Sequence, residues 1–461
     1  MMGPRQEAQS ALFYEFCLED HVPADHMLRS IDRFVDLDDI RQHLGSFYSS
    51  TGRPSVDPEL MIRILLVGYC MGIRSERRLC EEVHLNLAYR WFCRLDLGDA
   101  VPDHSTFSKN RHGRFRDSDL LRHVFETVVA RCIAEGLVSG QRFAVDASLI
   151  AADANRQNST SKEEWQSDKI NPEAAPRAVR EYLETLDDAA FGAATTVNPK
   201  FTSHSDPASQ WTAARKGPAY FAYSTNYLID TDNAVILDVE ATRTVRQAEV
   251  GAARTMIDRV AKSFDLHPER LIADTAYGSA PMLEWLVKGR GIAPHIPVID
   301  KSGRKDGTFE RADFTHDTKN DLYICPGGKE LKQNRRAFTI PRTPKPDKEG
   351  IMRYRAKKSD CDACGIKAQC TPKEPQRKIL RSIYEPSRNV ARNITKTIDY
   401  AISCKLRKKV EMLFAHLKRI LKLDRLRLRG PCGVKDEFHL AATAQNLRKL
   451  AKLIKEPSQT A

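Results

Sequence analysis

The stretch AISCKLRKKVEMLFAHLKRILKLDRLRLRG, residues 401–430, guides the interpretation of the whole chain. Its apolar residues recur at the intervals of a helix with one packed face, namely Val410, Leu413, Phe414, Leu417, Ile420 and Leu421. A neighbouring stripe of the same helix carries Cys404, Arg407, Glu411 and Lys418. This stripe places a carboxylate between cations at the rim of a core. A lone glutamate in such a place is most often half of a solvated ion pair.

Two other stretches each put an aspartate into a short apolar run. QRFAVDASLIAA, residues 141–152, predicts a buried strand that carries Asp146. PERLIADTAYGS, residues 268–279, predicts a strand that ends at Asp274, and open α/β sheets place ligands at that end of a strand. An ionised carboxylate in an apolar strand is costly unless it is paired, hydrogen-bonded or bound to a metal. We therefore expect both aspartates to share a metal site with Glu411.

At these residues the chain resembles the DDE transposases of bacterial insertion sequences. Around their glutamate these enzymes carry Tyr, two residues, Arg, three residues, Glu, six residues and Lys. Arg407, Glu411 and Lys418 fit that spacing, whereas Cys404 stands where the tyrosine would be. The segment PDHSTFSKNR, from Pro102 to Arg111, is similar to the phrase that closes the N-terminal domain of many such transposases. Together these resemblances extend over nearly the whole chain.

The resemblance implies an α/β fold with a ribonuclease-H-like mixed-sheet core. It also implies that Asp146, Asp274 and Glu411 bind two Mg²⁺ or Mn²⁺ ions, with Asp146 bridging the ions, and that Arg407 and Lys418 neutralise phosphate charge or orient the glutamate. Such a site cuts the ends of a mobile element and joins the freed 3′-hydroxyl to target DNA. The implied partners are the terminal inverted repeats, target DNA and a second copy of the chain in a homodimer.

Two other functions stay open. A nuclease of the same fold would share the three acids without needing an N-terminal helical module. A catalytically silent DNA-binding protein derived from a transposase would keep the fold and the basic charge. Cleavage confined to the repeat ends, cleavage anywhere, or binding alone would separate the transposase from these two alternatives.

The charge of the chain favours a polyanionic partner. The 461 residues include 73 Lys and Arg against 61 Asp and Glu, which gives a formal net charge of +12 and a pI of about 9.1. The first residues lack the pattern of a secretory leader, and no run of about 18 apolar residues follows. We therefore expect a soluble protein of the bacterial cytoplasm, associated with the nucleoid.

Four segments are predicted: a helical N-terminal domain over 1–136, the first part of the core over 137–300 with a polar insertion at 153–219, a second insertion over 301–394, and the rest of the core over 395–461. In the first segment, capped helices after Asp57, Ser75 and Asp103 suggest a helix-turn-helix-like module, or else a supporting helical bundle. Candidate phosphate contacts, for each of which a solvated charge is the commoner explanation, are Arg74, Arg77, Arg78, Lys109, Arg111, Arg114, Lys422, Arg425, Arg427 and Arg429.

The second insertion contains a group of cysteines. Cys361 and Cys364 form a C-x-x-C pair, Cys370 follows closely, and Cys325 lies upstream. Four thiolates with this spacing would close a tetrahedral structural zinc site. Alternatively, Cys325 is unrelated and the other three are ordinary thiols of a reducing compartment.

Overall fold

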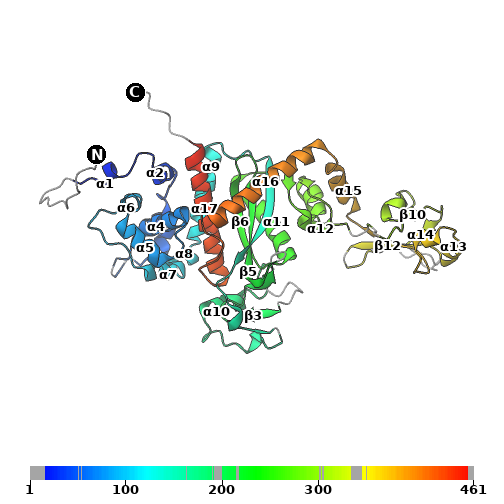
Figure 1. Ribbon diagram of the computed structural model, residues 1–461, viewed down its shortest axis with the longest axis horizontal. Coiled ribbons are helices and arrows are strands. Elements are labelled where there is room, and N and C mark those ends of the chain that lie inside the picture. Colours follow the sequence, from blue (N-terminus) through cyan, green and yellow to red (C-terminus); the bar gives the residue numbers. More distant parts are fainter. Residues whose placement is uncertain are drawn as a thin grey trace, which may run out of the picture. The chain divides into compact units, whose positions relative to one another are not determined.

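The computed structural model describes residues 16–49, 51–52, 54–161, 163–188, 190–191, 200–213, 217–300, 303, 306–333, 345–348 and 350–454 (Figure 1). Both ends of the chain and parts of the two predicted insertions lie outside these residues. The chain divides into two compact units: residues 1–139, 147–266 and 409–461 form the first, and residues 140–146 and 267–408 form the second. This division does not test the four segments predicted from the sequence. Among the described helices, none has the length and hydropathy needed to cross a membrane.

The first unit begins with a run of helices: α1 (Leu18–His21), α2 (Met27–Asp32), α3 (Ile40–Leu44), the 3₁₀ turn η1 (Gly45–Phe47), α4 (Pro58–Met71), α5 (Glu76–Leu85), α6 (Leu87–Phe92), α7 (His104–Arg111), α8 (Arg114–Asp117) and α9 (Leu120–Ala134). The predicted caps are present, because the side chains of Asp57, Ser75 and Asp103 each accept a backbone N–H at the start of α4, α5 and α7. Gly72 ends α4 with φ +72°, and a Cβ there would lie 2.7 Å from the carbonyl oxygen of Ile420.

One predicted helix is divided in two. The segment that follows Ser75 was expected to form a single helix, but the chain leaves helical geometry at Asn86. The Asn86 side chain accepts hydrogen bonds from the backbone N–H groups of Ala88 and Tyr89 and so starts α6. The short polar side chain competes with the helix for backbone donors, and this competition explains the break.

The sheet is mixed and has six strands: β1 (Arg142–Ala151), β4 (Gln210–Ala213), β5 (Ala219–Asp230), β6 (Val235–Thr242), β7 (Arg270–Ile272) and β8 (Ala293–His295). Their order is β4-β5-β1-β7-β8, and β6 pairs with β5. The strand-like runs AYFAYSTNYLID and AVILDVEATR predict a hairpin, and the antiparallel pairing of β5 with β6 confirms it. β1, β7 and β8 are parallel neighbours. Helix α11 (Arg246–Phe264) follows β6.

The long C-terminal helix α17 (Gly430–Leu453) carries much of the core of the first unit. It packs against α4, α9 and β6, and Figure 1 shows it in red beside α9. The buried Asn446 amide accepts from Ile236 N at 3.0 Å and donates to Ile236 O at 2.8 Å. It satisfies one backbone donor and one backbone acceptor of β6.

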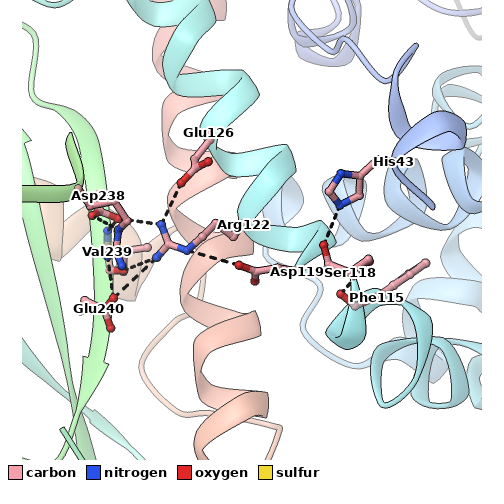
Figure 2. Close-up of polar contacts among 10 residues, drawn as sticks. His43, Phe115, Ser118, Asp119, Arg122, Glu126, Asp238, Val239 and Glu240 are labelled. Atoms are coloured by element: carbon pink, nitrogen blue, oxygen red, sulfur yellow. Dashed lines mark hydrogen bonds and ion pairs between the residues drawn. The ribbon is translucent and has the colours of Figure 1, made fainter. Parts of the chain in front are cut away.

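Ion pairs between side chains join helix α9 to strand β6. Figure 2 shows the Arg122 guanidinium between acids of its own helix and of the strand, with Asp238 Oδ1 at 3.2 Å. Arg259 of α11 bonds Asp238 and Glu240 at 2.7 Å each. Burial raises the pKa of Asp238, and the two guanidinium groups oppose that rise. The buried carboxylate is therefore paired from both flanking helices.

The first insertion includes packed structure, although its polar composition predicts an insertion or flexible connection outside the core. Its elements are η2 (Arg156–Asn158), β2 (Ser159–Ser161), η3 (Ser167–Lys169), α10 (Arg177–Glu184), β3 (Phe201–Ser203) and β4. Helix α10 packs against α17. Asp206 is fully buried, and its carboxylate accepts a hydrogen bond from the Tyr223 hydroxyl at 2.6 Å. The polar composition hides this packing because some of the polar groups, such as the Asp206 carboxylate, are buried and hydrogen-bonded inside the fold.

The second unit continues from β7 through η4 (Thr275–Tyr277), α12 (Ala280–Glu284), the π-helical turn η5 (Trp285–Arg290), β8, η6 (Arg311–Asp313), β9 (Thr315–Asp317), β10 (Leu322–Ile324), β11 (Glu330–Leu331), β12 (Ile351–Arg355), α13 (Lys358–Asp362), α14 (Lys367–Cys370), β13 (Lys378–Ser382) and α15 (Glu385–Ile394). A small core of its own forms around Tyr323, Tyr354 and Cys370. Helix α16 (Ile398–Arg419) begins in this unit and ends in the first.

Candidate active site

The parallel pairing of β1 with β7 brings two of the predicted acids to the same level. Ala144 pairs with Ile272 in this register, and each is two residues before an aspartate. Asp146 lies on β1 and Asp274 is the second residue after the end of β7, so the two carboxylates lie at corresponding positions of neighbouring strands. Their side chains are 20% and 38% exposed, respectively. Both therefore remain open to a ligand.

The guanidinium of Arg407 lies near both carboxylates. Arg407 Nη2 lies 3.9 Å from Asp146 Oδ2 and 4.0 Å from Asp274 Oδ2. These distances allow electrostatic attraction but are too long for hydrogen bonds. Among the described residues, the buried Nε of Arg407 has no hydrogen-bond partner. The guanidinium is thus held loosely at the point that the two acids share.

The sequence after β7 fixes the orientation of the second aspartate. Asp274 Oδ1 accepts the backbone N–H of Ala276 at 2.7 Å, which leaves Oδ2 toward Arg407. Gly278 closes the turn, where a Cβ would lie only 2.0 Å from the carbonyl oxygen of Pro297. A glycine is therefore required at position 278 by the close backbone approach beside the acid.

Glu411 and Lys418 belong to the first unit, in the later part of α16. Glu411 is exposed and follows Arg407 by one helical turn. Lys418 is engaged elsewhere, because its Nζ donates to Leu149 O of β1 at 2.9 Å. Burial lowers the pKa of Lys418. Its ammonium group joins the helix to the strand.

A phenol that the sequence interpretation did not include lies one turn before Cys404. Tyr400 lies near Cys404 and Arg407, which both act on the pKa of its phenol. Burial raises the pKa of Tyr400, and Cys404 raises it further. In the family the tyrosine stands at the position that Cys404 occupies here. A tyrosine four residues earlier, on the same helix face, could have been considered as well.

The four cysteines of the second insertion line one pocket. Cys325, Cys361, Cys364 and Cys370 all belong to its wall. A Cβ on Gly327 would lie 3.6 Å from Cys364 Sγ and 3.7 Å from Cys325 Sγ, so this glycine leaves room between the two thiols. Lys329 N donates to Cys325 Sγ at 3.2 Å. Within the described part of the chain, no three His, Cys, Asp or Glu side chains stand in an arrangement that could hold a metal ion.

Several of the predicted phosphate contacts bind protein groups. Arg74 is 4% exposed and pairs with Glu437, and Arg111 is 3% exposed and pairs with Glu76. These two residues cannot face DNA, so their prediction was wrong. Their acidic partners could not be identified from the sequence because Glu437 lies hundreds of residues downstream. Other members of the set form ion pairs as well, namely Arg78 with Glu82, and Arg425 and Arg429 with Asp153.

Comparison with protein families completes the description of the site. A model described as a transposase domain matches residues 16–113, and a model described as a transposase DDE domain matches residues 324–451. The chain belongs to the DDE transposases. The second match includes Arg407, Glu411, Lys418 and the four cysteines, whereas Asp146 and Asp274 lie before it. The DDE domain makes the protein a polynucleotidyl transferase, and enzymes of this class generally use divalent metals.

A cryo-EM structure of the piggyBac transposase synaptic complex with hairpin DNA matches 92% of this chain and 75% of that chain, with 10% sequence identity and a TM-score of 0.35. No curated protein matches the sequence.

Proposed function

We propose that this DDE transposase serves a bacterial insertion sequence, binds the terminal inverted repeats, and cuts and joins DNA at Asp146, Asp274 and Glu411. The main support is the approach of Arg407 Nη2 to within 4.0 Å of both aspartates, because it identifies a point where a cation is attracted by two carboxylates. The ribonuclease-H-like assignment of the core is part of this proposal.

The residues present suit Mg²⁺ or Mn²⁺. Asp146 and Asp274 offer hard carboxylate oxygens that are partly exposed, so that water and phosphate oxygens can complete a coordination shell. Glu411, exposed one turn after Arg407 on α16, would supply the third carboxylate. Two bound ions would activate the attacking oxygen and stabilise the leaving oxygen.

The protein groups have separate tasks in this mechanism. Strand pairing and the Ala276 N–H orient the carboxylates before DNA arrives. The Arg407 guanidinium lacks a close hydrogen bond to either acid, so it is available to pair with a phosphate oxygen. Lys418 holds α16 against Leu149 and thereby positions the helix segment that carries Glu411.

We also propose that the pocket lined by the four cysteines binds a structural zinc ion. The support is the gathering of Cys325, Cys361, Cys364 and Cys370 around one pocket and the electrostatic influence of the other three thiols on Cys370. In this proposal zinc binding draws the thiolates from their present spacing into a tetrahedral set. The role is structural, since it would stabilise the small core around Tyr323 and Tyr354.

The decisive experiment uses a DNA fragment that carries the inverted repeats flanking the gene. Purified protein is incubated with this fragment in Mg²⁺ or Mn²⁺, and the positions of strand breaks are mapped. Breaks confined to the repeat ends support the proposal. Breaks at any sequence indicate a nuclease, and binding without breaks indicates a silent DNA-binding protein. Asp168→Asn, which alters an exposed aspartate of the first insertion, is the matched control for changes at Asp146.

A further inference from the structure

The end of α16 and the last turns of α17 enclose a groove in the first unit. Two adjoining pockets of ≈ 480 Å³ and ≈ 400 Å³ share four lining residues: His416, Gln445, Lys449 and Lys452. His416 Nδ1 and Gln445 Oε1 are 2.7 Å apart, so the two helices are joined at the floor. We call this feature the basic groove.

Cations dominate the basic groove. Arg448 lines one of its pockets and Lys409 the other, in addition to the two shared lysines. In the described part of the chain none of these four side chains forms an ion pair, whereas most arginines of the N-terminal helices do. Lys409 donates instead to the carbonyl oxygens of Thr231 and Asp232 at 3.2 and 3.0 Å. Among the residues that line the two pockets, the four cations stand against one carboxylate, that of Asp232, so positive charge is in excess.

Each basic group of the groove disfavours the protonated, charged form of its neighbours. Burial lowers the pKa of Lys449, and Lys452 and Lys409 lower it further. Burial likewise lowers the pKa of His416, against the effect of the Gln445 hydrogen bond, and Arg448, Lys449 and Lys452 add to that lowering. Such a concentration of like charge in a partly buried groove is relieved when an anion binds.

Helix geometry spaces these cations along a line. Gln445, Lys449 and Lys452 recur on one face of α17. Exposed Met412 of α16 and Leu453 of α17 line the pocket that also contains Lys409. A row of cations beside apolar side chains matches a sugar–phosphate chain, in which anions repeat between apolar sugars. A single small anion would neutralise only part of the row.

We propose that the basic groove binds the phosphate backbone of double-stranded DNA through Lys409, Arg448, Lys449 and Lys452. This inference rests on the proposed function, since it assigns a surface of the same protein to its DNA partner. It concerns residues other than the three acids and Arg407, because neither pocket of the groove is lined by any of them. The contacts do not read bases, so they act on any sequence.

The test is the salt dependence of binding to a duplex of unrelated sequence, measured without added divalent metal. Changing Lys449 and Lys452 together to Gln should reduce the slope of log K against log salt by about 2, because each lysine neutralises one phosphate and contributes roughly one to the slope. The double change to Arg keeps both charges and should retain the slope. Lys262→Gln, at an exposed lysine of α11 that lines neither pocket, is the matched control and should leave the slope unchanged.

Each outcome has a clear meaning. An unchanged slope in the folded Gln double variant overturns the groove proposal, and so does an altered self-association in sedimentation with unaltered DNA binding, which would make the groove an interface between copies. Thermal unfolding confirms that each variant is folded. A lowered slope in a protein that never cuts repeat ends would support the groove while contradicting the proposed function. The two proposals therefore fail separately.

Discussion

Arg407 Nη2 lies 3.9 Å from Asp146 Oδ2, and the same nitrogen lies 4.0 Å from Asp274 Oδ2. The guanidinium thus stands where two carboxylates from adjacent parallel strands attract the same positive charge. Neither contact is a hydrogen bond at these distances, so a stronger ligand for the acids can displace the guanidinium at little cost. This relationship underlies the predictions for the acids.

Two substitutions of Asp274 separate its charge from its role in the turn. Asp274→Asn keeps a side-chain oxygen for the Ala276 N–H but removes the charge. We expect strand cleavage to fall by about 10³-fold or more while stability is retained, because the lost charge acts on the reaction. Asp274→Ala should lose cleavage equally and also about 1 kcal/mol of stability with the missing cap. Rate measurements and urea unfolding test both. Equal unfolding midpoints for the two variants would contradict the assigned cap.

Lys418 is predicted to act on stability and not on DNA binding. Lys418→Met keeps the length of the side chain but leaves Leu149 O without its donor, so we expect a loss of about 1–3 kcal/mol in the free energy of unfolding. The salt slope of DNA binding should stay that of the unmodified protein. Lys262→Met is the control for stability. A variant with normal stability and a lowered salt slope would show that Lys418 contacts phosphate instead.

Much of this site could be predicted from local sequence. Asp146 and Asp274 interrupt apolar strands, and the helical spacing of the segment after Cys404 identified Arg407 and Glu411. The pairing that aligns the two aspartates depends on contacts between residues far apart in the chain, so the register of the two strands could not be predicted from local sequence.

Long-range pairing also explains the errors. Arg74 and Arg111 looked like surface charges because their neighbours in sequence are polar. Both are nevertheless buried, and each lies against an acid of α17. Local propensity cannot reveal an ion pair across that separation. In contrast, the break at Asn86 follows from a local rule, the capping preference of asparagine, which the apolar periodicity on either side concealed.

Asp206 should make stability depend on pH. Burial raises its pKa from 3.8 to about 7, against the opposing Tyr223 hydrogen bond. The folded state therefore binds a proton more tightly than the unfolded state, and the stabilisation is complete below about pH 4 and is lost as the pH rises through about 7. The loss from this group is on the order of 4 kcal/mol at most.

Asp206→Asn tests this dependence because an amide does not titrate. Urea unfolding at pH 5 and pH 8 should show that the unmodified protein loses more stability between the two values than the variant does. Asp168→Asn, at an exposed site in the same insertion, should behave like the unmodified protein. Identical losses in the Asp206 variant and the unmodified protein would mean that Asp206 is ionised throughout this range.

The cysteine pocket should contain about one zinc ion per chain. Metal analysis of protein purified without chelator measures this content. Cys361→Ser combined with Cys364→Ser should abolish it and destabilise the second unit, because two of four ligands are lost. Cys17→Ser, at an exposed cysteine outside the pocket, should retain the metal. Unmodified protein that is free of zinc would contradict the proposed structural site.

The most direct test of the central claim is electron paramagnetic resonance of bound Mn²⁺ in the full-length protein with repeat-end DNA. The account predicts two Mn²⁺ ions per active site with the spin coupling of a pair about 3.5–4 Å apart. It also predicts that Asp146→Asn abolishes this coupling, whereas Asp168→Asn leaves it unchanged. A coupled pair that persists in the Asp146 variant, or its absence from the unmodified complex, would contradict the claim that these carboxylates hold the catalytic metals.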